Sequence, residues 1–462
     1  MKKFMILAAV AMLVGGASAA VRDTISLNAG WQFHLGELSG IEAVKNAKSE
    51  RVNLPHDFLI GQPWVEPDAS ERPDNSDAGS NVRSRLSPRG FKEMNVGWYR
   101  YVLTPKAEWK GRRVVLDFQG IMLVGDVWLN GKHIGKTDYG YLGFDTDISS
   151  ILKYDGDNEI IVKANTQQPN NSRWYTGGGL YRDVNLIVTD KKLYFPRHPL
   201  FIRTENNKKV KIQAEIACFN KVDNIPAEVK IYDANGEVVA QKKQNIVFNG
   251  KWRTREYELQ PIEIDNANLW SCESPYLYTA EVTLFDNQGN VVDQIREQFG
   301  VRTIEFSPDF GFKLNGKKVL LKGYANHHTL GALGAAAYPR AIEKRIQLMK
   351  SFGYNHIRTS HNPYSEDFMR LCDRYGILVV DELYDKWLTQ YAGGRVEWEA
   401  LWQRDVPEWV KRDRNHPCVV LWSLGNELQQ YPNLPFNDWG VTAYKLQREL
   451  LHRYDNTRLT TV

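Results

Sequence analysis

The chain has 462 residues, of which 42% are hydrophobic, and this is enough for roughly two or three domains with cores of their own. Its formal net charge is only +4, and its lysines and arginines are scattered without runs. Charge therefore gives no indication of binding to nucleic acid or to an anionic membrane. Composition predicts a soluble globular protein of several domains.

The first 20 residues read "MKKFMILAAVAMLVGGASAA", with two lysines, an apolar stretch and small residues in an A-x-A pattern. This pattern predicts a secretory signal peptide over residues 1–20, and hence an exported protein that is periplasmic or secreted. No other window approaches the roughly 20 apolar residues that a membrane-spanning helix needs. We therefore expect no association with a membrane.

The sequence contains four cysteines, which are Cys218, Cys272, Cys372 and Cys418. They form no CxxC motif and have no histidine at ligand spacing, so no metal site is predicted from them. Cys372 and Cys418 lie in apolar stretches and are expected in the core. Cys218 and Cys272 share one β-rich region, so a disulfide between them is one possibility.

Residues 21–190 have the pattern of a β-sandwich of the jelly-roll type, because β-branched and aromatic runs alternate with turns. Within "LNGKHIG", Asn130 and Gly131 predict a two-residue hairpin turn. The stretch Pro67–Glu93 is long for a connection and is either a functional loop or disordered. Residues 191–305 contain further strand-like runs, such as "KVKIQAEIACF" and "YLYTAEVTLFD", and predict an immunoglobulin-like β-sandwich.

From residue 306 to 462, strand and helix patterns alternate, which predicts a parallel sheet covered by helices and thus the N-terminal part of a (β/α)8 TIM barrel. The first helix, "RAIEKRIQLMKSFG", is expected to bury Ile342, Ile346, Met349 and Phe352 on one face. The expected strands are "KKVLLKGYA", "HIRTSH", "ILVVDE", "CVVLWSLGNE" and "RLTTV". The other expected helices are "SEDFMRLCDRYG", "WEALWQRDVPEWVKRD", in which Pro407 predicts a kink or break, and "VTAYKLQRELLHRY".

Polar residues stand at the ends of four successive strands of this region, where the active site of a parallel barrel lies. An isolated strand-end acid is often a cap or a satisfied core group, but the recurrence over successive strands favours a functional site. The glycine-rich stretches lack the order GxxxxGK[ST] and predict turns rather than a phosphate loop. The strand ends carry His327 and His328; Thr359, Ser360 and His361; Asp381 and Glu382; and Asn426 and Glu427.

Several stretches together resemble a family 2 glycoside hydrolase of the β-galactosidase and β-glucuronidase group, and most resemble a bacterial β-galactosidase. The resemblance implies an exo-acting retaining hydrolase of terminal β-linked sugars, with a β-linked oligosaccharide or glycoside as its partner. An oligomer is possible, and no nucleic acid is expected. The stretches are "LNAGWQF", "VNLPHDF", "VGWYRYVL", "VWLNGKHIG", "GLYRDVNL", "FGVRTIEF", "LNGKKVLLKGYANHH", "IRTSHNPYSEDFMRLCDRYGILVVDE" and "NHPCVVLWSLGNE".

The resemblance also implies roles for two adjacent residues. Glu427 is implied as the general acid/base, and Asn426 as the neighbour that hydrogen-bonds the sugar 2-hydroxyl. A retaining glycosidase protonates the departing oxygen and later deprotonates water with the same carboxyl. Hydrogen bonds to the 2-hydroxyl strengthen in the transition state, which suits a fixed amide.

The resemblance extends to other strand ends. His361 and Asn362 match a substrate-contacting "HNP" loop, and His327 matches a strand end of the site. For either histidine, a structural role is an equal alternative. Asp381 matches an acid that often shapes the sugar pocket, whereas Glu382 could be a buried ion-pair partner.

Two departures from the family pattern matter. The loop after "VVDE" reads "LYDKWLT" and lacks the Glu-x-His that binds Mg²⁺ in some β-galactosidases, so neither an essential metal nor a cofactor is expected. The chain stops at Val462, inside the fifth expected strand, whereas the resemblance places the nucleophile on a later strand. We therefore expect a C-terminally truncated member whose isolated chain is inactive.

Three alternatives remain open. Asp381 or Glu382 could serve as the second carboxylate, because adjacent strands lie about 4.8 Å apart and retention needs carboxyls roughly 5 to 5.5 Å apart. The enzyme could be a β-glucuronidase or β-mannosidase. The chain could also be a non-catalytic carbohydrate-binding protein that uses the jelly roll alone.

Overall fold

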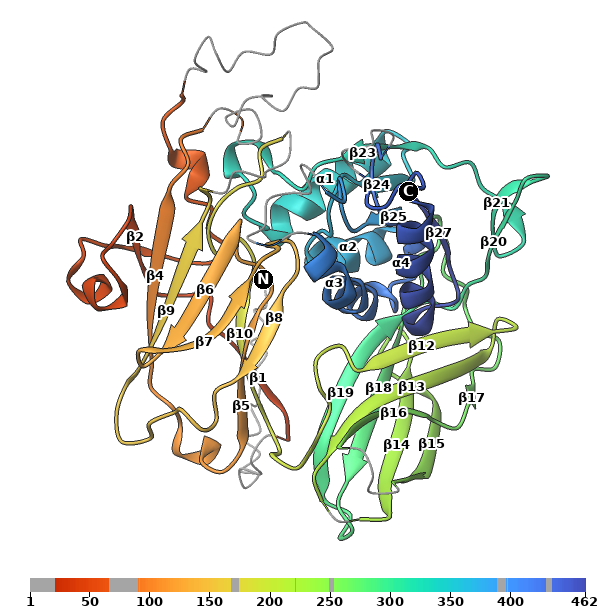
Figure 1. Ribbon diagram of the computed structural model, residues 1–462. Helices are drawn as coiled ribbons and strands as arrows, with labels where there is room; N and C mark the ends of the chain where they lie inside the picture. The colour runs from red at the N-terminus through yellow and green to blue at the C-terminus, as the bar shows by residue number, and fades with distance from the viewer. Residues whose placement is uncertain are drawn as a thin grey trace, which may run out of the picture.

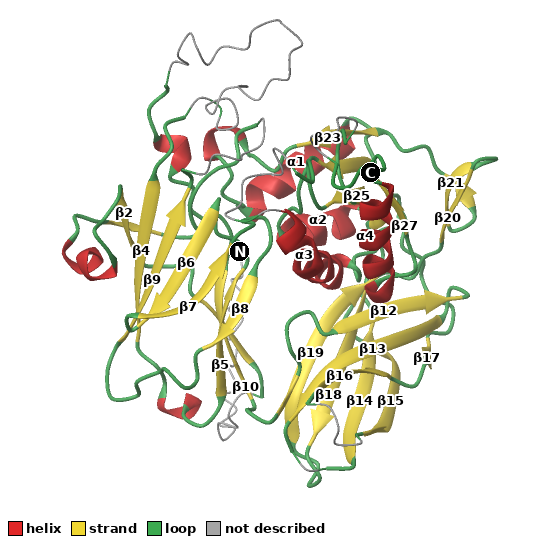
Figure 2. Ribbon diagram, in the orientation of Figure 1, coloured by secondary structure: helices red, strands yellow, loops and turns green. Residues whose placement is uncertain are grey.

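The computed structural model describes residues 21–65, 90, 92–167, 174–220, 222–248, 253–388, 396, 398–428 and 434–462. In Figures 1 and 2, a first β-sandwich stands beside a segment of alternating strands and helices, and a second β-sandwich lies below that segment. The prediction for residues 1–20, and most of the stretch Pro67–Glu93, fall outside the described residues.

The first part is the predicted jelly roll, built from two antiparallel sheets with the strand orders β1-β10-β5-β8 and β3-β2-β4-β9-β6-β7. The side chains between the sheets, including Trp31, Tyr99 and Phe118, are fully buried. Asn130 and Gly131 have φ of 51° and 82° and connect β6 to β7, as the hairpin prediction requires. The strands are β1 (Asp23–Ser26), β2 (Trp31–Leu35), β3 (Glu50–Val52), β4 (Val96–Leu103), β5 (Arg113–Phe118), β6 (Val124–Leu129), β7 (Lys132–Thr137), β8 (Phe144–Asp147), β9 (Asn158–Asn165) and β10 (Val184–Thr189).

The second part is the predicted immunoglobulin-like sandwich. One sheet is centred on β13, which pairs with β11, β12, β16 and β17, and the other has the order β15-β14-β18-β19. Alternate residues of β13 are buried in the shared core, as a half-buried strand requires. The strands are β11 (Leu193–Tyr194), β12 (Leu200–Glu205), β13 (Lys209–Cys218), β14 (Asn224–Tyr232), β15 (Val238–Val247), β16 (Thr254–Glu258), β17 (Ile262–Glu263), β18 (Tyr278–Phe285) and β19 (Val291–Phe299).

All four cysteines are free and buried, which contradicts the possible disulfide between Cys218 and Cys272. Cys218 packs inside the second sandwich, whereas Cys272 packs in the core that includes the barrel helices. The two thiols therefore belong to different cores. Cys372 and Cys418 are fully buried, as expected.

The third part is the predicted barrel segment, with five parallel strands in chain order, β23-β24-β25-β26-β27. A small antiparallel sheet, β20-β21-β22, precedes it. These strands are β20 (Ile304–Ser307), β21 (Gly311–Leu314), β22 (Lys317–Lys318), β23 (Gly323–Asn326), β24 (His356–Thr359), β25 (Leu378–Glu382), β26 (Val419–Ser423) and β27 (Leu459–Thr461). The helices are α1 (Pro339–Ser351), α2 (Glu366–Tyr375), α3 (Trp398–Asp413) and α4 (Val441–Tyr454). The short 3-10 helices within the described residues are η1 (Ile41–Asn46), η2 (Leu59–Gly61), η5 (Ala107–Trp109) and η6 (Gly331–Leu333).

Local signals explain where two of these helices begin and end. The Ser365 side chain accepts a hydrogen bond from the backbone N–H of Phe368 at the start of α2, and Gly376 ends α2 with a φ of 69°. Helix α3 continues through Pro407, so of the predicted kink or break, the break does not occur. None of the helices in the described ranges combines the length and the apolar composition needed to span a bilayer.

Two local predictions in the barrel segment are wrong. Phe352 is 74% exposed because α1 ends one residue earlier, at Ser351, and the backbone turns there. The stretch "KKVLLKGYA" is not one buried strand, since β22 and β23 are separate and Leu320 between them is 71% exposed. In the described residues β23 is an edge strand, so its outer side is not covered by a neighbour.

Arginine side chains join both sandwiches to the barrel segment by hydrogen bonds to backbone carbonyls. Arg182 of the first sandwich donates from Nη2 to the carbonyl of Pro363, 2.8 Å away. Arg302 donates from Nε to the Pro417 carbonyl at 2.5 Å and from Nη2 to the Val419 carbonyl at 2.7 Å. The first sandwich therefore binds the segment that follows β24. The second sandwich binds the segment that leads into β26.

Candidate active site

The two acids at the end of β25 point to opposite faces of the sheet. Asp381 accepts a hydrogen bond from Nε1 of Trp409 on α3, 2.6 Å away, so it faces the helix layer. Glu382 instead contacts Arg358 of β24 and Ser423 of β26, on the face away from the helices. This is the period-2 alternation of a strand, and it makes Glu382 the acid that faces the barrel interior.

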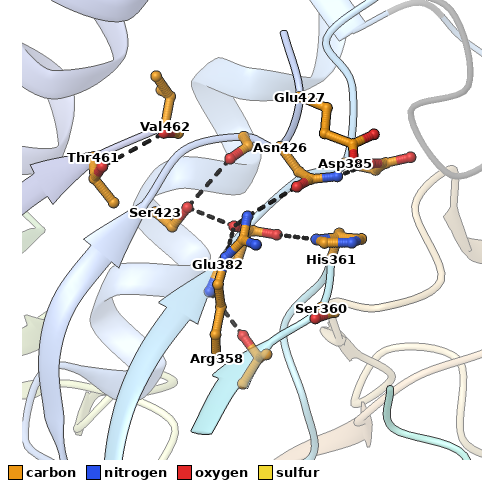
Figure 3. A network of polar contacts seen from close by, with 12 residues as sticks. Arg358, Ser360, His361, Glu382, Asp385, Ser423, Asn426, Glu427, Thr461 and Val462 are labelled. Atoms are coloured by element: carbon orange, nitrogen blue, oxygen red, sulfur yellow. Dashed lines mark hydrogen bonds and ion pairs between the residues drawn. The ribbon is translucent and has the colours of Figure 1, made fainter. Parts of the chain in front are cut away.

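Glu382 is the centre of a buried polar cluster, which Figure 3 shows from close by. Its carboxylate has no exposed surface and accepts hydrogen bonds from Arg358 Nε at 2.9 Å and Nη2 at 2.6 Å. It also accepts from Ser423 Oγ and from His361 Nδ1, each at 2.6 Å. Glu382 is therefore a buried ion-pair partner, as one of the two interpretations expected, and its charge is balanced where it lies.

Asn426 is fixed by charged groups on both sides of its amide. Its Nδ2 donates to Asp385 Oδ1 at 2.8 Å, and its Oδ1 accepts from Arg358 Nη2 at 3.0 Å. Because a guanidinium can only donate and a carboxylate accepts, these two partners determine which way the amide points. Asn426 thus presents a rigid amide at the end of β26.

Glu427 is the point at which this polar network reaches the surface. Lys386 donates from Nζ to Glu427 Oε2 at 3.2 Å, and the Glu427 side chain is 61% exposed. Glu427 has a φ of 49°, a left-handed conformation that is uncommon for a residue other than glycine and that recurs at functional sites. A carboxylate in such a place has access to a ligand from solvent.

The turn before Glu427 has little space for a side chain at Gly425. A Cβ atom at Gly425 would lie 2.9 Å from Cδ1 of Leu428 and 3.1 Å from Nε1 of Trp387. The same indole donates to the carbonyl of Leu424 at 2.8 Å. Trp387 therefore supports the turn that carries Asn426 and Glu427.

The first sandwich contributes an aromatic side chain to the rim of this site. Trp174 stacks on His327 with ring centroids 4.7 Å apart, and it meets His361 edge-on at 5.3 Å. His327 in turn contacts the carbonyl of Ser360 through Nδ1 at 3.1 Å. The rim is thus assembled from two parts of the chain that are far apart in sequence.

Burial keeps His328, the neighbour of His327, electrically neutral. Desolvation, aided by the charge of Arg182, lowers its pKa to about 3. Aromatic rings of Tyr141, Tyr181 and Tyr364 pack around it. His328 is a core group beside the site rather than an acid or a base at neutral pH.

Family models match the chain in three successive segments. Residues 91–181 match "Glycosyl hydrolase 2 galactose-binding domain-like", residues 198–302 match "Glycosyl hydrolases family 2", and residues 308–462 match "Glycosyl hydrolases family 2, TIM barrel domain". The chain belongs to glycoside hydrolase family 2. The resemblance in the sequence is thereby confirmed, and so is the fold class.

The relatives of this chain within family 2 are named for more than one activity. The chain is 32% identical to a β-galactosidase of Bacteroides ovatus over 88% of this chain and 47% of that protein. It is 28% identical to a β-glucuronidase of Bacteroides fragilis over 96% of this chain and 61% of that protein. A family 2 structure from Bacteroides cellulosilyticus superposes with a TM-score of 0.83 at 32% identity, over 95% of this chain and 56% of that one. The chain spans about half the length of the curated relatives it matches.

The structure brings together most of the residues that the sequence pointed to, with two exceptions. Glu427, Asn426, His361 and His327 lie around one strand-end region. Asp381 does not, because alternation turns it toward α3. Its expected place in a sugar pocket stays a prediction.

Asn362 is the second exception. Its side chain has no exposed surface, and its Nδ2 donates to the carbonyl of Pro363 at 3.1 Å. As placed, its amide contacts the loop that carries His361. The expected contact with substrate stays a prediction.

Sequence reasoning missed several residues of the cluster. Arg358 stands in the strand-like stretch "HIRTSH", and Asp385 and Lys386 are neighbours of opposite charge between the aromatic residues of "YDKW". Charged residues at such positions are signals that charged groups pair inside the fold. Trp174 had no comparable signal, because its partners lie more than a hundred residues away in the chain.

In the residues that the structure describes, no group of three or more His, Cys, Asp or Glu side chains is arranged to hold a metal ion. Lys386 places an ammonium group in the loop after β25, which is the loop where the sequence lacks the Glu-x-His triplet. The absence of an essential metal remains a prediction.

Proposed function

We propose that this chain carries the acid/base side of the active site of an exo-acting retaining glycoside hydrolase that removes terminal β-linked galactose. The observation that carries the proposal is Glu427, an accessible carboxylate at the end of β26 and next to a fixed amide. In a retaining mechanism one carboxyl protonates the leaving oxygen and then takes a proton from water, so it must reach both the bond and solvent.

Asn426 suits the second part of the proposal. Arg358 and Asp385 leave its amide little freedom to rotate, so a hydrogen bond to a sugar 2-hydroxyl would cost little conformational entropy. Such a bond strengthens as the oxocarbenium-like transition state forms. Asn426 is therefore proposed to stabilise the transition state more than the bound substrate.

The contacts of the two β25 acids argue against either as the nucleophile. Glu382 is fully buried and has donors on both oxygens, and Asp381 lies on the helix side of the sheet. We propose that the nucleophile belongs to a later barrel strand, as the resemblance implies. Residues 1–462 alone should then have only background activity.

The sugar itself is a finer proposal, because family 2 relatives are named both β-galactosidase and β-glucuronidase. Hydrolysis of nitrophenyl β-galactoside, β-glucuronide and β-mannoside tests it, with residues 1–462 followed by the remaining barrel strands. Highest kcat/KM on the galactoside supports the proposal, and highest kcat/KM on either other sugar replaces it with that activity. Sugar binding without any turnover would favour a non-catalytic carbohydrate-binding protein.

The proposed enzyme is exported, since residues 1–20 have the pattern of a signal peptide. Expression in a bacterium followed by cell fractionation tests this. A mature protein in the periplasm or medium that begins near residue 21 supports export, and an intact N-terminus in the cytoplasm contradicts it.

A further inference from the structure

Lys386 is a nearly buried cation in the candidate site, with its side chain 5% exposed. Its Nζ donates to the carbonyl oxygen of Asn426 at 2.8 Å, to Asp385 Oδ1 at 3.1 Å and to Glu427 Oε2 at 3.2 Å. An ammonium group has three donors and no acceptor, so each donor has a partner here. The lysine is therefore fully engaged in holding the strand end and has no donor left for a ligand.

We propose that Lys386 is the positioning residue that directs the Glu427 carboxylate and stabilises its ionised form. The inference rests on the proposed acid/base role of Glu427. A cation within about 4 to 6 Å favours the charged form of a carboxyl, and a hydrogen bond to that form adds to the effect. Retaining hydrolysis needs Glu427 first as an acid and then as a base, so Lys386 favours the second, water-activating step.

The charges around Lys386 alternate in sign. Asp385 lies between Lys386 and Asn426, and Arg358 lies on the far side of Asn426. Arg358 is balanced in turn by Glu382, which also contacts His361.

Removal of the lysine would take away the cation whose Nζ contacts the carboxylates of both Asp385 and Glu427. A like charge disfavours ionisation, so the loss of Lys386 should raise the pKa of Glu427 for two reasons. The first reason is the loss of the cation, and the second is repulsion by the Asp385 carboxylate, which the lysine no longer screens.

Titration of residues 1–462 labelled with ¹³Cδ-glutamate tests the proposal without any need for turnover. The Glu427→Gln spectrum identifies the Glu427 resonance. We expect Lys386→Met to raise its titration midpoint by about one pH unit, which allows for the partial exposure of Glu427. Lys386→Arg should retain most of the wild-type midpoint, and Lys344→Met, which removes an exposed lysine on α1, should leave it unchanged.

An unchanged Glu427 midpoint in folded Lys386→Met protein would overturn the proposal, and near-ultraviolet circular dichroism reports whether the fold is intact. If Lys386→Met does not fold, Lys386→Gln provides the same loss of charge with a polar side chain. In the active enzyme, Lys386→Met should move the pH–rate profile of deglycosylation to higher pH. A shifted NMR midpoint with an unmoved pH–rate profile would support the coupling of Lys386 to Glu427 and reject the acid/base role of Glu427.

Discussion

His361 donates a hydrogen bond from Nδ1 to the buried carboxylate of Glu382, 2.6 Å away. The same carboxylate binds the guanidinium of Arg358 and the hydroxyl of Ser423, so Glu382 joins three consecutive barrel strands. Its role is to hold the other polar groups in place, because a carboxylate so enclosed has no access to substrate.

Glu382→Gln should therefore impair both stability and activity. The substitution leaves Arg358 without its buried counter-charge, which should cost about 3 kcal/mol of unfolding free energy, measured by urea denaturation. Glu343→Gln is the matched control, since Glu343 also contacts an arginine at 2.6 Å, but that arginine, Arg340, is 84% exposed. Equal losses of stability in the two variants would contradict the assigned role of Glu382.

Asp381→Asn should leave kcat and KM unchanged, because Asp381 faces α3 rather than the site. Burial, and then the charge of Asp413, raise the pKa of Asp381 well above its usual range. The folded protein thus holds this proton at pH values where the unfolded chain has lost it. The contribution of Asp381 to stability is full below about pH 4 and is lost as the pH rises through the raised pKa.

The asparagine mimics the protonated form, so the stability of Asp381→Asn should fall less than that of the wild type between pH 4 and 8. Urea denaturation across this range measures the difference. A large increase in KM on substitution would contradict this prediction and indicate that Asp381 contributes to the sugar pocket.

Asn426→Ala should reduce activity far more on the normal glycoside than on its 2-deoxy analogue. The deoxy sugar has already lost the hydroxyl that the Asn426 amide is proposed to bind, so the two losses are not additive. The measurement is kcat/KM of the wild type and of Asn426→Ala on both substrates, which together form a thermodynamic cycle. Equal reductions on the two substrates would remove this role from Asn426.

His328→Phe should make the protein more resistant to acid. The pKa of His328 is lowered to about 3 in the folded state, mainly by burial, whereas the unfolded chain has the usual value near 6.5. Stability is therefore full above about pH 6.5 and is lost as the pH falls toward 3, because only the unfolded chain binds the proton. A phenylalanine, which also fits among aromatic rings, removes this loss.

Circular dichroism during acid titration measures the midpoint, which should move to lower pH in His328→Phe. His452→Phe, at an exposed position on α4, is the control and should leave the midpoint in place. A midpoint that is the same in wild type and His328→Phe would mean that another group dominates acid unfolding.

The sequence predicted the elements well where a local pattern decides them. Helix α4 and the hairpin of Asn130 and Gly131 follow from periodicity and turn chemistry, and α2 ends at Gly376, the last residue of the expected helix "SEDFMRLCDRYG". The failure at Phe352 has a local cause, since periodicity does not show at which residue a helix stops.

The sequence could not show which residues of β25 face the barrel interior and which face the helices, and the reason is physical. A parallel strand is buried on both faces, so hydrophobicity does not distinguish Asp381 from Glu382. The position of Trp174 was also unpredictable, because it depends on how the first sandwich meets the barrel segment. Both gaps are matters of tertiary contact rather than of local propensity.

Chemical rescue of Glu427→Ala is the most direct measurement of the central claim. With residues 1–462 followed by the remaining barrel strands, the variant should hydrolyse alkyl β-galactosides about 10² to 10⁴ times more slowly than the wild type. An activated aryl galactoside should lose less in its glycosylation step, because its leaving group needs little protonation. Added azide should then restore turnover and yield a β-galactosyl azide, since a small anion can replace water where the base is missing. Wild-type rates on alkyl galactosides, or no azide product at all, would contradict Glu427 as the acid/base.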